Sequence, residues 1–177
     1  MGIRSAAANP TYRFVALFAL YLAVISVGYP WLTKRWIDGV KAITTGTAVI
    51  EYQILSLVSD EAKLTENLVQ LGPFSVRIIE ECTGVFEALI FMAAVLAYPT
   101  RWLDKLIGFV LGVPILYLFN VARILVLVWV GRFHYTLFDF MHLYFWQATL
   151  ILMITSVWLL WIFKVVRHGD SSDPAGA

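Results

Sequence analysis

Four long apolar stretches constrain the fold of this chain more than any other feature of its sequence. The first, residues 14–31, carries no charge, and as a helix it is about 27 Å long, close to the hydrocarbon thickness of a bilayer. The others cover residues 82–98, 106–130 and 142–163. Only 14% of the residues are charged, against about 25% in soluble domains. The sequence therefore predicts an all-α integral membrane protein, a bundle of four transmembrane helices.

Charge and cysteine content exclude several other classes of protein. The formal net charge is +1 and no basic stripe is present, so nucleic acid is not an expected partner, whereas the lipid bilayer is. A single cysteine excludes an intrachain disulfide and a multi-cysteine metal site. The first apolar stretch is followed by Thr33, Lys34 and Arg35 rather than by a small-residue cleavage site, which favours a retained helix over a signal peptide.

The placement of Lys and Arg predicts the orientation in the membrane. Positive charge close to the ends of the spans favours the cytoplasmic side. The basic residues that gather on one side are Arg4, Arg13, Arg101, Lys105, Lys164 and Arg167. We therefore expect a cytoplasmic N-terminus (residues 1–13), one membrane domain (14–168) and a disordered cytoplasmic tail (169–177), so that the protein is a multi-pass protein of the cell membrane with both termini in the cytoplasm.

The segment 33–81 is then expected on the outer side. Residues 47–58 fit both a helix and a strand, and an amphipathic helix lying on the membrane is favoured. After the turn signal Gly72-Pro73, apolar Phe74, Val76 and Ile78 alternate with polar residues, which predicts a short strand running into the second span. The bundle thus gains a small extracytoplasmic helix/strand element.

Arg123 is the strongest single indication of chemistry, because arginine inside a span costs at least about 2.5–3.5 kcal/mol. It lies eight residues before Gly131, roughly 12 Å below the outer end of the third span. It could hold helices together, for example through Glu87, or stabilise an anionic intermediate. Asn120 shares its helical face and could hydrogen-bond it or contribute an oxyanion donor.

Cys82 stands at the predicted outer start of the second span. A thiol at a helix N-terminus feels the positive end of the helix dipole, which favours the reactive thiolate. Glu80 and Glu81 oppose this effect unless their side chains point to water. Thr83 could serve simply as the N-cap of the span, and Gly84 permits close approach of the backbone.

His142 opens the fourth span and could act as a general base toward a thiol. His134 is a rival at a similar height but lies in the middle of a loop. A zinc site built from these two histidines and Cys82 is conceivable, yet no recognised ligand spacing supports it, so no metal is expected.

Three motifs in order resemble those of the exosortase/archaeosortase family. The segment Glu81–Gly84 resembles its Cys-Ser/Thr-Gly element, residues 120–124 resemble its Asn-x-x-Arg element, and His142 resembles its third element. The matching region covers about residues 76–163. The chain is short, with one span before the cysteine, which resembles the compact, exosortase H-like members.

The resemblance implies a cysteine transpeptidase that needs no cofactor. Such an enzyme cleaves C-terminal sorting signals, each a short motif followed by a transmembrane helix and a basic end, on exported, membrane-tethered proteins. Cys82 would form a thioester acyl-enzyme at the extracytoplasmic face, with Arg123 and His142 completing the triad. Asn120, Glu81, Glu87 and Thr83 would contact the substrate or support the triad. The alternative function is a non-enzymatic membrane assembly or transport subunit in which Arg123, Asn120 and Glu87 form a structural polar cluster.

Overall fold

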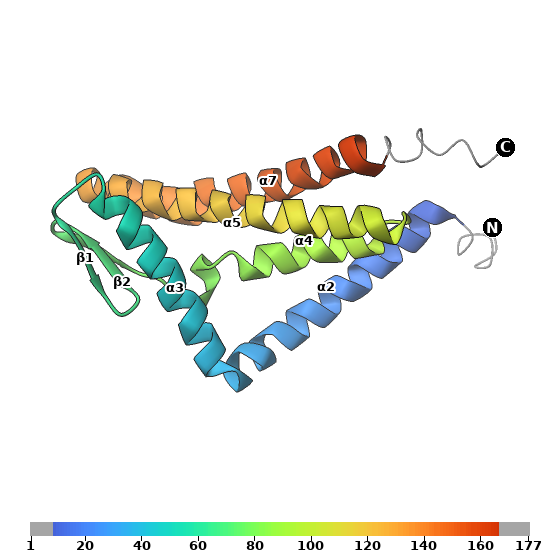
Figure 1. The fold of residues 1–177 in the computed structure, drawn as a ribbon, viewed down its shortest axis with the longest axis horizontal. Coiled ribbons are helices and arrows are strands. Elements are labelled where there is room, and N and C mark those ends of the chain that lie inside the picture. The colour runs from blue at the N-terminus through green and yellow to red at the C-terminus, as the bar shows by residue number, and fades with distance from the viewer. Residues whose placement is uncertain (1–8, 167–177) are drawn as a thin grey trace.

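The computed structural model describes residues 9–166, and its longest helices follow the apolar stretches (Figure 1). Three are long and apolar enough to cross a membrane: α2 (Pro10–Arg35), α5 (Trp102–Phe133), and the helix formed by α7 (Trp146–Trp161) with its π-helical continuation η3 (Ile162–Val166). The tail predicted to be disordered lies outside the described residues.

Local sequence signals fix the ends of α2. The Asn9 side chain accepts a hydrogen bond from the Thr11 backbone N–H at 2.9 Å, and Pro10 occupies the first turn, where its missing N–H costs nothing. Lys34 and Arg35 stand in the last turn, where they complement the helix dipole. Beyond Trp36 the chain turns back into α3 (Ile37–Ser56) (Figure 1).

The second predicted span is the short helix α4 (Val85–Ala97). Its 13 residues are apolar but reach only about 20 Å, less than the roughly 30 Å of a hydrocarbon core. Of the four predicted spans, three are thus helices long enough to cross a membrane, and the second is a shorter apolar helix. Helices α2 and α5 extend several residues beyond both predicted ends, whereas the last span, Trp146–Val166, is shifted toward the C-terminus at about its predicted length.

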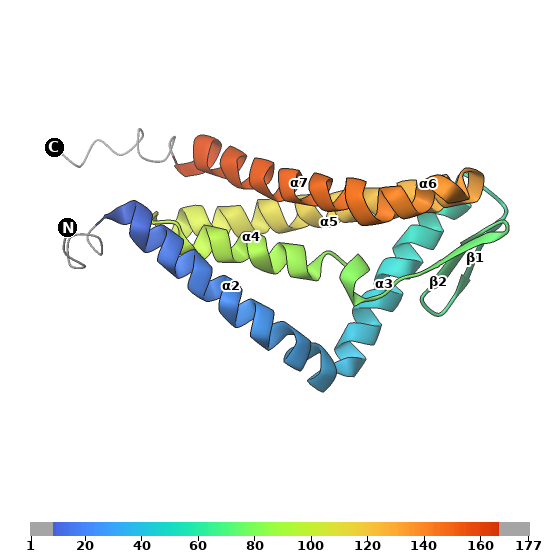
Figure 2. The same ribbon diagram turned by 180° about the vertical axis from the view of Figure 1, so that it is seen from behind.

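Helices α4, α5 and α7 pack side by side (Figures 1 and 2). Two glycines one turn apart on α5 allow this close approach, since Gly112 faces the ring of Phe91 on α4 and Gly108 faces Trp161 on α7. The Trp161 indole Nε1–H also donates to the Asp104 backbone carbonyl at 2.7 Å. A cluster of buried apolar side chains, the bundle core, joins the three helices around Phe91, Leu116 and Leu150.

The segment between α3 and α4 contains more strand than predicted. The strand expected at residues 74–78 is confirmed as β3 (Phe74–Arg77). It pairs with β2 (Leu68–Leu71), which pairs with β1 (Ala62–Thr65), in an antiparallel sheet of order β1-β2-β3. The fold is therefore mostly helical with a small sheet rather than all-α. The helix favoured for residues 47–58 is confirmed up to Ser56 as the end of α3, which begins at Ile37, and its place on the membrane surface stays a prediction.

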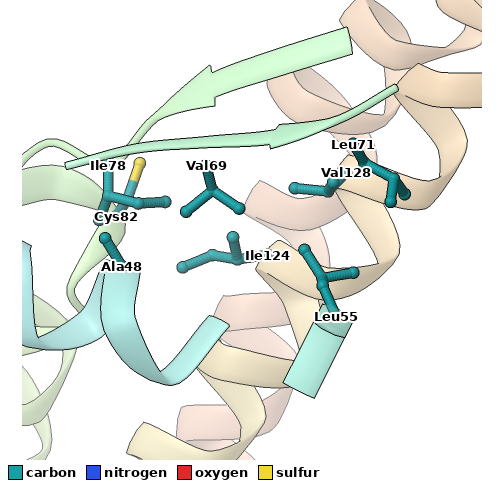
Figure 3. Close-up of a cluster of buried hydrophobic side chains, with 8 residues drawn as sticks. All are labelled: Ala48, Leu55, Val69, Leu71, Ile78, Cys82, Ile124 and Val128. Carbon is teal, nitrogen blue, oxygen red and sulfur yellow. The ribbon is translucent and has the colours of Figure 1, made fainter. Parts of the chain in front are cut away.

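The sheet and α3 pack on the C-terminal part of α5 and form a cap with its own core (Figure 3). Strand β2 turns Val69 and Leu71 inward, both almost fully buried, toward Ile124 and Val128 of α5. Cys82 belongs to the same cluster (Figure 3). The cap core thus reaches from the sheet to the single thiol of the chain.

Two short elements connect α5 to α7. They are α6 (Tyr135–Phe140) and the π-helical η2 (Met141–Phe145), which leads directly into α7. His142 therefore stands inside a helical segment rather than at the start of one. A π-helical turn inside a helix is rare and is frequent at functional sites.

Candidate functional site

The structure brings Cys82, Arg123 and His142 to one cavity. The thiol cavity, as we call it, has a volume of about 310 Å³ and lies among α4, α5, η2 and α7. Each of the three residues comes from a different element, separated by 41 and 19 positions along the sequence. This is the juxtaposition that the sequence predicted for them.

Cys82 ends the 3₁₀ turn η1 (Glu80–Cys82), and α4 begins three residues later. The thiol therefore precedes the helix rather than standing on its first turn, so the helix dipole acts on it from a greater distance than expected. The residue is 9% exposed and its sulfur is free. It lies between the cap core on one side and the thiol cavity on the other.

Asn120 holds this turn against α5. The side chain is 1% exposed, and its amide Nδ2 donates to the Cys82 backbone carbonyl at 2.5 Å. Its other end, Oδ1, accepts a hydrogen bond from Nη1 of Arg123 at 3.4 Å. Of the two roles expected for Asn120, the structure contains the bond to arginine. One of the two amide N–H groups that could serve an oxyanion is directed to the carbonyl of Cys82.

Arg123 is 8% exposed and lines the thiol cavity. Its Nε has no hydrogen-bond partner, although a buried donor normally finds one. The partnership expected with Glu87 is absent: both side chains are described, no ion pair joins them, and Oε2 of Glu87 is likewise buried without a partner. The arginine thus retains an unused donor beside the thiol.

Gly84 is required where α4 begins. Its backbone has φ +73°, and a Cβ there would lie 3.2 Å from the Cβ and Cγ of Asn120. This close approach agrees with the prediction for Gly84. Thr83 is not the N-cap, since Gly84 holds that position; the Thr83 hydroxyl instead donates to the Glu80 carbonyl at 2.7 Å and closes the cysteine turn.

An aromatic stack supports His142. Its ring lies 5.5 Å from that of Phe138, centroid to centroid, with 6° between the planes. Phe138 meets Phe74 of β3 edge-on at 5.1 Å, and Phe74 packs on Gly131 of α5. The sheet therefore reaches the imidazole through two rings. The rival His134 is exposed at the end of α5 and does not line the cavity.

Glu81, Phe86 and Glu87 form a wall between the thiol cavity and a larger groove. This α2–α4 groove, of about 580 Å³, is also lined by Glu80 and Lys34. Glu81 itself is exposed. The larger of the two hollows thus contains none of the three predicted catalytic residues.

Among the residues around the triad that were not predicted are Gln147 and Phe138. Gln147 lines the thiol cavity five residues after His142, and its polarity in an apolar span was a usable signal. Phe138 carried no such signal, because one aromatic residue among many reveals no contact. Within residues 9–166, no group of three His, Cys, Asp or Glu side chains is arranged to hold a metal ion.

A family model described as transmembrane exosortase matches residues 2–161. Because the match covers most of the chain, this protein belongs to the transmembrane exosortase family. Exosortases are membrane transpeptidases that process C-terminal sorting signals. No curated protein and no solved structure matches the chain. The family resemblance is thus confirmed, and the placement among compact, exosortase H-like members stays a prediction.

Proposed function

We propose that this protein is a cysteine transpeptidase that cleaves the C-terminal sorting signals of membrane-tethered proteins, with Cys82 as nucleophile. One observation carries the proposal: Cys82, Arg123 and His142 line a single cavity, although they come from three different elements. A buried arginine with an unused donor beside a free thiol is costly for a purely structural cluster and useful for a reaction that develops negative charge.

The first half-reaction forms a thioester. His142 takes the thiol proton, the Cys82 sulfur attacks the scissile carbonyl carbon, and the carbonyl oxygen becomes an oxyanion. When the intermediate collapses, the C–N bond breaks and His142 returns the proton to the leaving amine. The signal helix departs, and the exported protein stays bound through its acyl group to sulfur.

Arg123 stabilises the oxyanion in this scheme. Its Nε–H is the unpartnered donor, and the bond from Nη1 to Asn120 limits how far the guanidinium turns. One well-placed oxyanion donor is worth about 3–4 kcal/mol in the transition state. In the second half-reaction an amine, or water, attacks the thioester carbonyl and the sulfur leaves as thiolate.

The membrane arrangement belongs to the same proposal. The short helix α4 crosses together with α2, α5 and α7, both ends of the chain lie in the cytoplasm, and the cap faces outward. The basic residues near the cytoplasmic ends of the helices support this orientation. The thiol cavity then opens at the outer interface, where the motif of a tethered substrate leaves the bilayer.

The test uses Cys82→Ala in the native host. Mass spectrometry of membrane proteins should show intact C-terminal signal peptides accumulating in the variant and only processed C-termini in the parent strain. The variant protein should be as abundant as the parent, since alanine is small and apolar. Unchanged processing in Cys82→Ala would overturn the proposal.

The assembly-subunit alternative predicts the opposite pattern. It expects Cys82→Ala to be tolerated and Arg123→Ala to reduce abundance, because removing the arginine disrupts the buried polar cluster. The transpeptidase predicts loss of processing in both variants, with Arg123→Lys also defective because a lysine ammonium cannot reproduce the guanidinium geometry. Quantifying the protein in the membrane fraction separates the two functions.

A further inference from the structure

The thiol cavity extends from the three polar residues into the apolar interior. Below Cys82 and His142 its walls are Ile90 of α4 and Leu150, Ile151 and Ile154 of α7. From His142 to Ile154 the cavity runs along η2 and α7 for about 18 Å, and we call this elongated part of the thiol cavity the slot. Figure 2 shows α4 and α7 side by side, the pair that borders this slot.

The lining changes from polar to apolar along this length. The charged and polar residues Glu81, Glu87, Arg123, His142 and Gln147 line the end nearest the cap, and Ile90, Leu150, Ile151 and Ile154 line the other end. A soluble peptide would place polar groups against the apolar end of the slot. A lipid chain would offer no hydrogen-bond acceptor to the Nε donor of Arg123. The slot fits a chain that is polar and extended at one end and an apolar helix at the other.

The slot is also open to its side. Ile151 is 61% exposed although it lines the cavity, so an occupant can enter laterally from the bilayer. The α2–α4 groove shares Glu81 and Glu87 with the thiol cavity but adds Glu80 and Lys34, and none of the three predicted catalytic residues lines it, so a helix bound there would not bring its peptide bond to the sulfur.

From this lining we infer that the slot between α4 and α7 receives the outer part of the substrate's own transmembrane helix. The inference rests on the proposed function and adds the docking face. Ile90, Leu150, Ile151 and Ile154 contact the first turns of that helix, and the residues just outside it pass Arg123 and reach the sulfur. The slot thereby selects substrates whose motif directly precedes an apolar helix.

Site-specific photocrosslinking tests the docking face. In the Cys82→Ala background, which retains unprocessed substrate, p-benzoylphenylalanine replaces Ile151 in one strain and Leu152 in another. Leu152 is the matched control, because it is the next residue of α7, is 68% exposed and does not line the slot. A third strain carries the crosslinker at Ser26, which lines the α2–α4 groove.

The inference expects crosslinks at Ile151 several-fold above those at Leu152 and Ser26. The crosslinked peptides should map to the C-terminal helix of proteins whose processing requires Cys82. Equal yields at Ile151 and Leu152, or a dominant yield at Ser26, would overturn the docking face. If processing continues in Cys82→Ala, the proposed function itself fails, and that outcome is seen without any crosslink.

A second pair of variants does not depend on the crosslinker. In the protein with Cys82 intact, Ile151→Trp fills the slot and should reduce processing at least several-fold. Leu152→Trp adds the same ring outside the slot and should leave processing near the parent level. Equal processing in the two variants, measured at equal protein abundance, counts against the docking face.

Discussion

At the scale of single residues, the site depends on polar groups placed in an apolar interior. Asn120 uses both ends of its amide, one on the Cys82 carbonyl and one on Arg123, so that one side chain fixes the nucleophile's turn and limits the guanidinium. Glu51 on α3, by contrast, is a fully buried polar residue, and neither of its carboxylate oxygens has a hydrogen-bond partner.

Asn120→Ala should cut processing about ten-fold or more. The Cys82 carbonyl loses its donor and Arg123 loses its acceptor, and leaving one buried polar group unpaired costs about 1–3 kcal/mol. The control is Thr155→Ala, because the Thr155 hydroxyl is exposed and bonds only to the Ile151 carbonyl of its own helix. Rates measured on a substrate identified through Cys82→Ala check this, and equal rates in the two variants contradict it.

Glu51→Gln should stabilise the protein in alkaline but not in acidic solution. Burial raises the pKa of Glu51 from 4.5 to about 8. Between these values the folded state holds a proton that the unfolded state has lost, so stability falls as pH rises from about 4.5 to about 8. Each unit of difference is worth about 1.36 kcal/mol, which gives a loss of at most about 5 kcal/mol.

Thermal unfolding in detergent at pH 5 and pH 8 measures this difference. The parent should lose stability between the two values, while the glutamine variant, which carries no titrating group at this position, should lose less. Glu66→Gln is the control, since Glu66 is exposed in the turn between β1 and β2. A parallel response of both variants to pH would contradict the assignment.

At the scale of elements, the three-stranded sheet supports the position of His142. Through Phe74 and Phe138 it reaches the face of the His142 ring, so the cap and the predicted general base form one packed unit. The π-helical turn η2 adds to this, because it re-aims the residues that it contains relative to a regular helix. The segment 62–77, which contains none of the predicted catalytic residues, thereby supports the site.

Phe138→Leu should lower the rate of processing more than it lowers stability. Leucine keeps the apolar volume near Phe74 but removes the parallel ring that orients the imidazole. Phe140→Leu is the matched control on the same helix, because Phe140 is exposed and stacks on Tyr144 instead. The measurement compares the turnover number and the unfolding midpoint of both variants with those of the parent protein. A drop in stability with the turnover number unchanged would contradict a positioning role.

At the scale of the whole molecule, two cores meet at the site. The cap core contains Cys82, the bundle core contains Leu150, and both residues line or border the thiol cavity. Helix α5 passes through both cores; its 32 residues extend about 48 Å, well beyond a hydrocarbon core of about 30 Å. The part that projects carries the cap, and Arg123 lies near the level where the two cores join.

The orientation predicts opposite labelling of two introduced thiols. In the Cys82→Ala background, Lys63→Cys in β1 should react with a membrane-impermeant maleimide on intact cells. Pro99→Cys, in the turn between α4 and α5, should react only after the membrane is opened. Both positions are exposed, so accessibility within the protein does not limit either reaction. The reverse labelling pattern would contradict the proposed orientation.

The parts that could be predicted from sequence depend on local composition. Long apolar runs identified the long helices, and the rarity of arginine in such runs identified Arg123. The bond from Asn120 to the Cys82 carbonyl joins residues 38 positions apart, and no local pattern encodes it. The β1–β2 hairpin was missed because each strand has four residues, too few for a reliable alternation, and packing on α3 and α5 stabilises it.

The shortness of α4 has a consequence for the space beside the cysteine. Next to partners that can cross the full bilayer, a helix of about 20 Å leaves a hydrophobic mismatch of about 10 Å, which the proposed orientation assigns to its outer end. No residue of α4 is exposed, so the mismatch falls on the space among the neighbouring helices rather than on lipid around α4. In the proposed orientation, a substrate helix that enters this space would expose to the thiol a peptide bond that a full-length α4 would cover.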